Sequence, residues 1–335
     1  MREILLIGNG PSATDHKLGR AIDAFPCVAR FNTFRIHGYK EYVGSKTDVW
    51  IACDNFPQWQ GDYKEVYYVS PVRDRPNPKF DNFKSQMPDA QVFPAWVWDD
   101  VCAEMKVHPS SGALAAYYFS KSYDRVYLYG FDCFQADKHH YGDDNSGCHH
   151  KAEKERAFID KLLDEGIVRW FNNYTILHDT KSGYGTGGAF GANILAFKPE
   201  SVLDYGCGKG GLVEYLRSNG IHAEGYDPYV YEWRNKPKRQ DMLVSTDFLE
   251  HIPEEGLSDV FSDMRSYHPR LMYHVISNRK ASQILPDGTN AHATIEDSDW
   301  WMARLYNEFP NYHVEQIEHN EKNNFTTYFM ELKSG

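Results

Sequence analysis

Two apolar segments of this chain each lead into a glycine-rich loop with polar side chains. Residues 4–7 are followed by Gly8-Asn9-Gly10-Pro11-Ser12, and residues 202–205 are followed by Gly206-Cys207-Gly208. Apolar runs that end in glycine are typical of buried strands followed by tight loops. Ligands of open α/β sheets bind beyond the carboxyl ends of such strands, and glycine lets backbone N–H groups approach a phosphate. Each loop therefore predicts a ligand site.

Further polar residues accompany the first loop. Asn32 ends a predicted strand over residues 27–32, and Ser110-Ser111-Gly112 precedes a predicted helix over residues 113–120. The first N–H groups of a helix have no partner within the helix, so this turn is suited to binding an anion. A polar loop over residues 137–150 is rich in histidine.

The composition describes an acidic globular chain with room for two domains. Its 335 residues are 41% apolar and 15% aromatic, which suffices for buried cores. The net charge of -11 argues against nucleic acid or an anionic membrane surface as the main partner. No run approaches the ~20 apolar residues of a membrane span. We expect no signal peptide, because the first predicted strand starts close to Met1.

The cysteine pattern predicts a reduced, cytoplasmic protein. The six cysteines are scattered and contain no CxxC pair. In a chain of this length, that pattern is typical of free, mostly buried thiols.

Hydrophobic patterns divide the chain into two α/β domains. Residues 1–180 alternate predicted strands and helices, which implies a mostly parallel sheet. Residues 181–193 are glycine-rich and predict a linker, and residues 194–335 begin a second α/β pattern. Within the first domain, we expect residues 74–89 to form a surface loop or lid and residues 168–177 to form the last strand.

Taken together, the N-terminal motifs resemble those of sialyltransferases. Residues 6–12, 28–32 and 43–47 look like the large sialyl motif, whereas residues 109–112 and 126–131 look like the small one. The order and spacing of these segments, rather than any single one, carry the resemblance.

Two shorter motifs extend the resemblance over residues 1–175. His140-Tyr141 resembles the short motif that follows the small one, and the spacing of His150 and Glu155 resembles the very small motif. Animal sialyltransferases join their large and small motifs by a disulfide. Here Glu3 stands before the first strand and no cysteine lies near Pro109, which agrees with a reduced compartment.

The resemblance implies transfer of a sugar acid, usually sialic acid, from a CMP donor to a glycan hydroxyl. The implied fold is a GT-A variant, with helices on both faces of a mostly parallel sheet. The implied mechanism inverts the anomeric carbon without a metal. The residues implied to bind the CMP donor are Gly8, Asn9, Gly10, Ser12, Asn32, Ser110, Ser111 and Gly112.

Histidine suits the general base of such a transfer, because its unperturbed pKa is about 6.5. The resemblance assigns this role to His150, with His149 as the neighbour that could replace it. His140 or Tyr141 would donate a hydrogen bond to the leaving phosphate.

Other interpretations of the first domain stay open. Ser110-Ser111-Gly112 is also what a plain helix cap needs, and Glu155 suits the first turn of a helix. The histidines and aspartates of residues 137–150 could hold a metal, but none of these histidines pair at i, i+4 spacing, and we expect no metal. The donor could carry Kdo or another keto sugar acid. The domain could also be a nucleotide-binding module without catalysis.

The C-terminal motifs resemble class I SAM-dependent methyltransferases over residues 189–333. Residues 202–210 look like the first motif of that family, and Asp227 matches the acidic residue that binds the ribose hydroxyls. Residues 245–253 resemble the segment after the fourth strand. The resemblance implies the class I fold and a SAM site formed by Asp204, Gly206, Gly208, Asp227 and Asp247.

The second domain departs from the family pattern in two ways. Residues 229–240 are too few for a further strand and helix, which we expect to be absent. No motif of the N-P-P-Y type is present, so we expect a hydroxyl or carboxyl acceptor. The candidate acceptor residues are His251, Asn290 and His292, although His251 also suits a packed core position. The chain is thus predicted to be a bifunctional enzyme. The fusion of the two domains gives the hypothesis that both activities act on one glycan.

Overall fold

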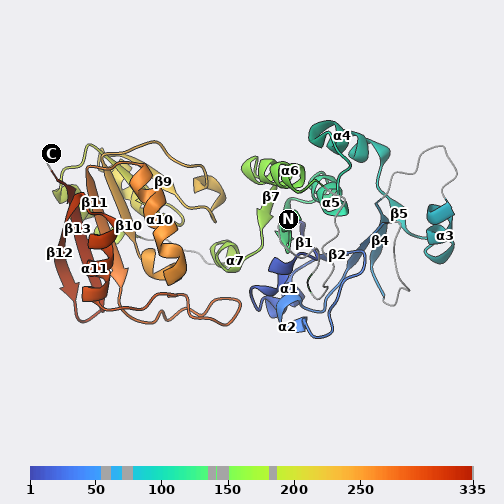
Figure 1. Ribbon diagram of the computed structural model, residues 1–335, viewed down its shortest axis with the longest axis horizontal. Coiled ribbons are helices and arrows are strands. Elements are labelled where there is room, and N and C mark those ends of the chain that lie inside the picture. The colour runs from blue at the N-terminus through green and yellow to red at the C-terminus, as the bar shows by residue number, and fades with distance from the viewer. Residues whose placement is uncertain (54–61, 70–77, 135–140, 142–150, 181–186, 334–335) are drawn as a thin grey trace. The chain divides into compact units, whose positions relative to one another are not determined.

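The computed structural model describes residues 1–53, 62–69, 78–134, 141, 151–180 and 187–333 (Figure 1). The chain forms two compact units, Met1–Asn173 and Tyr174–Gly335. Both are α/β, as the sequence predicted.

Part of the predicted linker is ordered structure of the second unit. Residues 187–193 form the 3-10 helix η2 (Gly187–Phe190) and the start of helix α8 (Gly191–Ala196). A Cβ on Gly191 would lie 2.1 Å from the Tyr215 ring, so this glycine serves close packing rather than flexibility. The expectation of a linker was wrong for these residues because glycine enrichment fits both situations.

The first unit is built on a seven-stranded sheet with strand order β5-β4-β3-β2-β1-β6-β7. Every pair of neighbouring strands is parallel. The strands are short and apolar because helices cover both faces of the sheet. Their bounds are β1 (Glu3–Ile7), β2 (Val28–Phe31), β3 (Val49–Ala52), β4 (Glu65–Tyr68), β5 (Gln91–Val92), β6 (Arg125–Tyr129) and β7 (Val168–Trp170).

The helices of the first unit bury apolar stripes against the two faces of this sheet. Apolar residues of α4, α5 and α6 form one core with β1, β2, β3 and β6, and Figure 1 shows α1 and α2 on the opposite face. Phe83 of α3 packs in a second cluster with Trp50 and Tyr68. The helices are α1 (Gly19–Ala24), α2 (Lys40–Val43), α3 (Pro78–Gln86), α4 (Ala95–Met105), α5 (Ser111–Phe119) and α6 (Ala152–Asp164), with the 3-10 helix η1 (Pro11–Thr14).

Two expectations for the first unit differ from the structure. Within the predicted lid of residues 74–89, residues 78–86 form helix α3, which the buried Phe83 anchors to the core. The predicted strand over residues 168–177 stops at Trp170, and α7 (Asn173–Thr180) follows. Apolar residues at 171, 174 and 177 recur every three positions, which suits a helix face better than a strand.

Strand order in the first sheet reverses at β1, so the loops after β1 and β6 lie side by side. Gly8 N–H donates to the Tyr129 carbonyl at 2.8 Å, and Gly10 N–H donates to the Gly130 carbonyl at 3.0 Å. A Cβ on Gly8 would lie 2.3 Å from the Gly130 oxygen. The crossing of these two loops therefore requires glycine. Ligands of parallel sheets bind at such a reversal point.

The second unit has a six-stranded sheet with strand order β12-β13-β11-β10-β8-β9. Strands β8 to β11 pair in parallel, whereas β13 is antiparallel to β11 and to β12. In the described part of the chain no strand lies beyond β9, in agreement with the short segment after Asp227. The strands are β8 (Ser201–Tyr205), β9 (His222–Tyr226), β10 (Met242–Thr246), β11 (Leu271–Ser277), β12 (Tyr312–Asn320) and β13 (Phe325–Leu332).

Helices again cover both faces of the second sheet. Apolar residues of α10 and α11 pack on one face, and those of α8 and α9 pack on the other. Strand order reverses between β8 and β10, so the loops after these strands meet at one edge. The helices are α9 (Gly211–Ser218), α10 (Glu254–Ser266) and α11 (Ser298–Glu308), with the 3-10 helices η3 (Tyr231–Trp233) and η4 (Leu249–His251).

Two further expectations can be compared with the described residues. None of their helices combines the length and apolarity that a membrane crossing needs. Cys27, Cys53, Cys102, Cys133 and Cys207 are free thiols, and Cys148 lies outside the described residues.

Candidate active sites

The first unit contains a cavity of about 400 Å³ at the reversal point of its sheet. Apolar side chains, among them Phe31, Phe131 and Trp98, form part of its wall. Of the predicted donor-binding residues, the structure brings to this cavity Gly8, Asn9, Gly10, Asn32, Ser110, Ser111 and Gly112.

Ser12 is the predicted donor residue that does not line the cavity. Its N–H donates to Asp132 Oδ2 at 3.0 Å. A Cβ on Gly10 would lie 2.3 Å from the same oxygen, so Asp132 packs against the glycine loop. The carboxylate of Asp132, which follows β6, thus stabilises the glycine loop after β1.

Two asparagines of the cavity keep part of their amide groups for a ligand. Asn9 Nδ2 donates to the Phe31 carbonyl at 3.1 Å, while its buried Oδ1 has no hydrogen-bond partner in the described part of the chain. Asn32 Oδ1 accepts from Cys53 N–H at 2.9 Å. Because this contact uses the oxygen of Asn32, the Nδ2 group is the donor that faces other partners.

Ser110 is engaged within the protein rather than by a ligand. Its Oγ accepts from Ala113 N–H at 3.1 Å and caps α5, and it donates to Glu155 Oε2 at 2.9 Å. Ser110 N–H donates to Glu155 Oε1 at 2.7 Å. Burial raises the pKa of Glu155, while the hydrogen bonds from Ser110 act in the opposite direction. Ser110 and Glu155 therefore fix the start of α5, where the first N–H groups of a helix have no partner within the helix.

The buried Arg30 joins two pieces of the large motif. Its Nη2 donates to the Val43 carbonyl at 2.5 Å, and its Nε donates to Thr47 Oγ1 at 3.0 Å. Burial lowers the pKa of Arg30 to about 10, which still leaves the guanidinium charged at neutral pH. Arg30 thus joins β2 to the loop before β3. These contacts give Arg30 a structural role within the large motif.

Only one of the predicted catalytic residues lies within the described part of the chain. Tyr141 is buried, and its hydroxyl donates to the Arg35 carbonyl at 2.8 Å. Its N–H donates to the Asn9 carbonyl at 2.8 Å, which attaches this residue to the glycine loop. His140, His149 and His150 lie outside the described residues.

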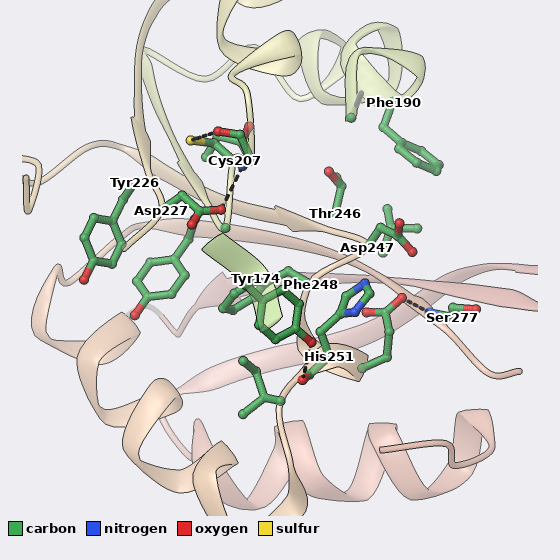
Figure 2. Close-up of a pocket in the computed structure, with 18 of the residues that line it drawn as sticks. Tyr174, Phe190, Cys207, Tyr226, Asp227, Thr246, Asp247, Phe248, His251 and Ser277 are labelled. Atoms are coloured by element: carbon green, nitrogen blue, oxygen red, sulfur yellow. Dashed lines mark hydrogen bonds between the residues drawn. The ribbon is translucent and has the colours of Figure 1, made fainter. Parts of the chain in front are cut away.

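The second unit contains a cavity of about 520 Å³ at the reversal point of its own sheet (Figure 2). Its wall includes every residue that the sequence predicts to bind SAM, namely Asp204, Gly206, Gly208, Asp227 and Asp247. Of the predicted acceptor residues, His251 lines this cavity, while Asn290 and His292 are absent from its lining.

Asp227 organises the loop after β8. Its Oδ2 accepts from Gly208 N–H at 3.0 Å, and its Oδ1 accepts from Tyr229 N–H at 3.0 Å (Figure 2). His178 Nε2 lies 4.0 Å from Oδ2. Burial raises the pKa of Asp227, while His178 acts in the opposite direction. The glycine loop and the carboxylate therefore form one hydrogen-bonded unit before any ligand binds.

Asp204, at the end of β8, is fully enclosed. Burial, and secondarily the charge of Asp227, raises the pKa of Asp204 to about 8. Its Oδ1 has no hydrogen-bond partner among the described residues. Next to it, a Cβ on Gly206 would lie 2.1 Å from the Phe248 ring, so glycine lets this ring close over the loop.

The segment after β10 supplies charged groups to the opposite wall. Asp247 has φ 56, a left-handed conformation that Asp adopts more readily than most residues, and its side chain is 70% exposed. Glu250 is fully buried, and its Oε1 accepts from Ser277 N–H at 2.7 Å. Burial raises the pKa of Glu250 well above its usual range and lowers that of His251.

Several residues that line this cavity are not among the site residues predicted from the sequence. Tyr174 and His178 come from α7, within the segment that the sequence assigned to the first domain, and Phe190 comes from the predicted linker. Their lining positions depend on how α7 and η2 pack, which local patterns do not reveal. Phe248 and Glu250 lie inside a recognised motif, so their sequence position could have indicated them.

Comparison with known proteins finds two family models that match different parts of the chain. Residues 2–56 match the family model of glycosyltransferase family 29, the sialyltransferases. Residues 188–324 match the family model of a methyltransferase domain. Residues 2–56 are thus similar to sialyltransferases and residues 188–324 are similar to methyltransferase domains, and both similarities indicate an enzyme. A comparison with curated proteins finds no match.

Solved structures show similarity at low identity. A mammalian sialyltransferase in complex with Gal-beta-1-3GalNAc-ortho-nitrophenol is 20% identical, covers 51% of this chain and 69% of its own, and has a TM-score of 0.41. The DhpI–SAH complex is 13% identical, covers 48% and 94%, and has a TM-score of 0.33. Magnesium protoporphyrin IX methyltransferase from Synechocystis, with bound SAM, is 14% identical, covers 49% and 98%, and has a TM-score of 0.34.

The raised pKa of Asp204 predicts a pH-dependent effect of Asp204→Asn. The unfolded chain releases this proton near pH ~4, whereas the folded protein retains it up to about pH 8. The wild-type residue therefore makes folding less favourable as pH rises between these values. We expect the free energy of unfolding of Asp204→Asn, relative to wild type, to increase from pH 5 to pH 8, by at most ~1.4 kcal/mol per pH unit.

Urea unfolding at several pH values measures this difference. Asp241→Asn is the control, because the hydrogen bond from Arg270 lowers the pKa of Asp241. Asp241 is ionised in both folded and unfolded chains above pH ~5, so its difference from wild type stays constant in this window. Parallel curves for wild type and Asp204→Asn would contradict the assignment.

Proposed function

We propose that the N-terminal unit transfers a sialic-acid-like sugar from a CMP donor to a glycan hydroxyl, with inversion and without a metal. The observation that carries this proposal is the convergence of the glycine loop, Asn32 and the start of α5 on one cavity. A single phosphate can be held by N–H and amide donors alone, without the metal that two phosphates usually require.

In this proposal, the donors of the cavity bind the CMP phosphate. Ser111 and Gly112 offer the N–H groups at the start of α5, and Asn32 offers Nδ2. The buried Oδ1 of Asn9 accepts a hydrogen bond from the nucleotide ribose. Departure of CMP leaves an oxocarbenium-like centre, which a deprotonated acceptor hydroxyl attacks from the opposite side. The oxygen–carbon bond forms as the bond to the phosphate oxygen breaks, and the phosphate keeps that electron pair.

We assign the general base to His150, with His149 as the alternative, and the hydrogen bond to the leaving phosphate to His140 or Tyr141. The Tyr141 hydroxyl donates a hydrogen bond to the Arg35 carbonyl oxygen. A direct hydrogen bond from Tyr141 to the leaving phosphate therefore requires that this bond break. Its attachment to Asn9 supports a second role, in which it positions the glycine loop.

The substitution Asn32→Asp tests the proposed phosphate contact. Aspartate keeps the oxygen that accepts from Cys53 N–H and tolerates the left-handed backbone at this position, where φ is 47. It replaces the Nδ2 donor by a negative oxygen, which repels a phosphate. We expect CMP affinity, measured by titration calorimetry, to fall at least ~10-fold, the equivalent of about 1.4 kcal/mol.

Thermal unfolding of the variant chain without ligand serves as the control, because it reports on the folding of the first unit, to which Asn32 belongs. Weaker CMP binding together with loss of an unfolding transition would point to unfolding. Retention of wild-type CMP affinity in a folded Asn32→Asp variant would remove Asn32 from the donor site. A panel of CMP-linked sugar acids, including CMP-Kdo, then identifies the sugar that the wild type accepts.

The substitution His150→Ala tests the proposed base. Loss of a general base lowers a rate by ~10²–10⁴-fold, so sugar transfer should fall by this factor while CMP binding stays unchanged. His149→Ala is the matched control and should affect the rate less. The reverse pattern would make His149 the base. If the wild-type protein binds CMP but does not cleave any CMP-linked sugar, the first unit is a nucleotide-binding module without catalysis.

We propose that the C-terminal unit transfers a methyl group from SAM to a hydroxyl oxygen. Asp227 would bind the ribose hydroxyls, and the loop of Gly206 and Gly208 would hold the methionine end. With no strand beyond β9 in the described part of the chain, we assign the adenine to Tyr174 and Tyr229, whose stacked rings lie 5.5 Å apart at this wall. The absence of an N-P-P-Y type motif supports an oxygen acceptor.

We propose further that both units act on one glycan, because they are parts of one chain. When the acceptor, the CMP donor and SAM are supplied together, mass spectrometry should detect a product that carries both the sugar acid and a methyl group. Omission of each donor in turn should give the two partial products or show their order. Transfer of the two groups to unrelated acceptors would contradict the shared substrate.

A further inference from the structure

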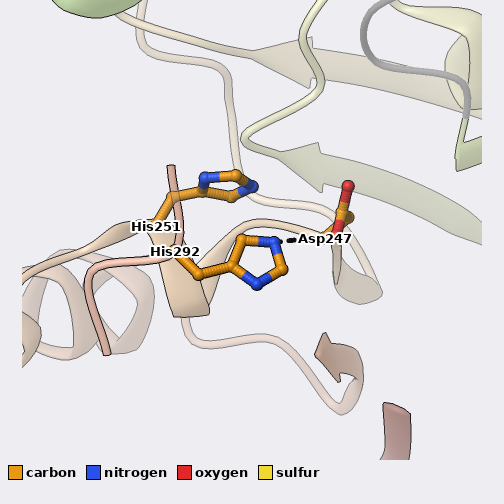
Figure 3. Close-up of side chains that lie close together, drawn as sticks. All are labelled: Asp247, His251 and His292. Carbon is orange, nitrogen blue, oxygen red and sulfur yellow. Dashed lines mark ion pairs between the residues drawn. The ribbon is translucent and has the colours of Figure 1, made fainter. Parts of the chain in front are cut away.

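A cluster of two histidines and one aspartate lies at the edge of the second cavity (Figure 3), and two of its members, Asp247 and His251, line that cavity. Asp247, His251 and His292 each offer one ligand atom, and these atoms lie within 4.8 Å of one another. His292 Nε2 lies 3.9 Å from Asp247 Oδ1, and the centroids of the two imidazole rings lie 4.9 Å apart. Two imidazoles and one carboxylate are a common ligand set for divalent transition metals.

The hydrogen bonds behind the imidazoles fix the tautomer that a metal needs. His251 Nδ1 lies 2.8 Å from the Ala291 carbonyl oxygen, and His292 Nδ1 lies 2.5 Å from that of Arg279. A carbonyl oxygen only accepts, so both Nδ1 atoms carry the proton. Both Nε2 atoms then present lone pairs, and Figure 3 shows the Nε2 of His292 directed at Asp247. Histidine ligands of metal sites are oriented by hydrogen bonds of this kind.

The chain around His292 holds this arrangement in place. Asn290 Oδ1 accepts from the N–H groups of Ala281 and His292, and its Nδ2 donates to the Ala281 carbonyl at 2.9 Å. The N–H groups of Ala293 and Thr294 donate to the Glu250 carbonyl at 2.8 and 3.0 Å. Asn290 therefore uses its side chain to shape the loop, and it acts as a positioning residue rather than as a contact of the methyl acceptor.

The acidic partner is held at the cluster by an unusual backbone conformation. Asp247 adopts φ 56, and its N–H donates to the Val275 carbonyl at 3.0 Å. Strained backbone of this kind concentrates at functional sites. The fully buried Glu250 lines the same wall, and its Oε2 has no hydrogen-bond partner in the described residues. A cation at the cluster would compensate the charge of the Asp247 carboxylate.

We propose that Asp247, His251 and His292 bind one divalent transition metal ion, of the Mn²⁺, Fe²⁺, Co²⁺ or Zn²⁺ class, at the edge of the proposed SAM cavity. Bonds of about 2.0–2.2 Å place the ligand atoms of such a site ~3–4 Å apart. The exposed Asp247 side chain would have to approach the two Nε2 atoms to reach these values, because hydrogen bonds hold both imidazoles. The expectation of no metal rested on the histidines of residues 137–150, which are not part of this cluster.

The position of the cluster gives the ion a role with the methyl acceptor, and this role rests on the proposed methyl transfer. Three protein ligands leave coordination positions open, and Asp247 and His251 line the cavity. A hydroxyl oxygen bound there loses its proton to water more readily. Its electron pair then forms the bond to the methyl carbon as the carbon–sulfur bond breaks, and the sulfur keeps that pair. The acceptor class is a molecule with one or two oxygens that complete the coordination shell.

Titration of the metal-free chain with Co²⁺ alone tests the site, and the d–d absorption bands of Co²⁺ report its ligands. We expect one ion at the cluster per chain, with affinity at least ~10–100-fold lower in His292→Ala and Asp247→Asn. Asparagine tolerates the left-handed backbone of position 247, so the second variant keeps the fold. His313→Ala, at an exposed position of β12, is the control and should bind as wild type does.

The thermal unfolding transition of each variant, measured without ligand, shows whether the variant is folded. If Co²⁺ binding is unchanged in both His292→Ala and Asp247→Asn, the ion binds elsewhere in the chain and the proposed site is overturned. Absence of Co²⁺ binding to the wild type would overturn it as well. The acceptor role is measured separately, by methyl transfer after EDTA treatment and after re-addition of Mn²⁺, Co²⁺ or Zn²⁺. If the protein binds the metal but EDTA does not change the rate of methyl transfer, the acceptor role is overturned while the metal site itself is retained.

Discussion

The structure depends on one constraint, which is the crossing of two backbone loops where the strand order of a parallel sheet reverses. In the first unit, the loops after β1 and β6 approach so closely that Gly8 leaves no room for a Cβ beside the Gly130 oxygen. In the second unit, the Phe248 ring after β10 occupies the corresponding space beside Gly206, after β8. Each crossing places N–H groups, amides and carboxylates around one cavity, and both candidate sites lie there.

This constraint changes what several motif residues mean. A glycine in a phosphate-type loop is commonly explained by contact with the ligand, yet Gly8 is already required by its neighbour across the sheet. Ser110 is bound to Glu155, and Arg30 joins β2 to the loop before β3. These residues shape the cavity from behind. In the proposed function, Asn9, Asn32 and the first N–H groups of α5 contact the donor.

The second unit shows the same division between residues that hold a site and residues that face a ligand. Asp227 binds two backbone N–H groups and keeps the glycine loop in place. Asn290 shapes the loop that carries His292, and the carbonyls of Ala291 and Arg279 orient the two imidazoles. The result is a cavity with a glycine loop on one wall and the cluster of Asp247, His251 and His292 at its other edge. That pairing suits the transfer of a group between a cofactor and an oxygen-rich acceptor.

The sequence by itself determined the two α/β parts, their glycine loops, the absent strand after Asp227 and the relation to two families, which the family models confirm. These features are local: an apolar run, a glycine and an acid at fixed spacing produce them wherever the chain goes. Only the tertiary structure decided that residues 187–193 pack on the second unit and that Tyr174 and His178 line its cavity. It also decided that His292 meets Asp247 and His251. These contacts join residues far apart in the chain, and their geometry arises from packing and long-range hydrogen bonds that no local pattern records.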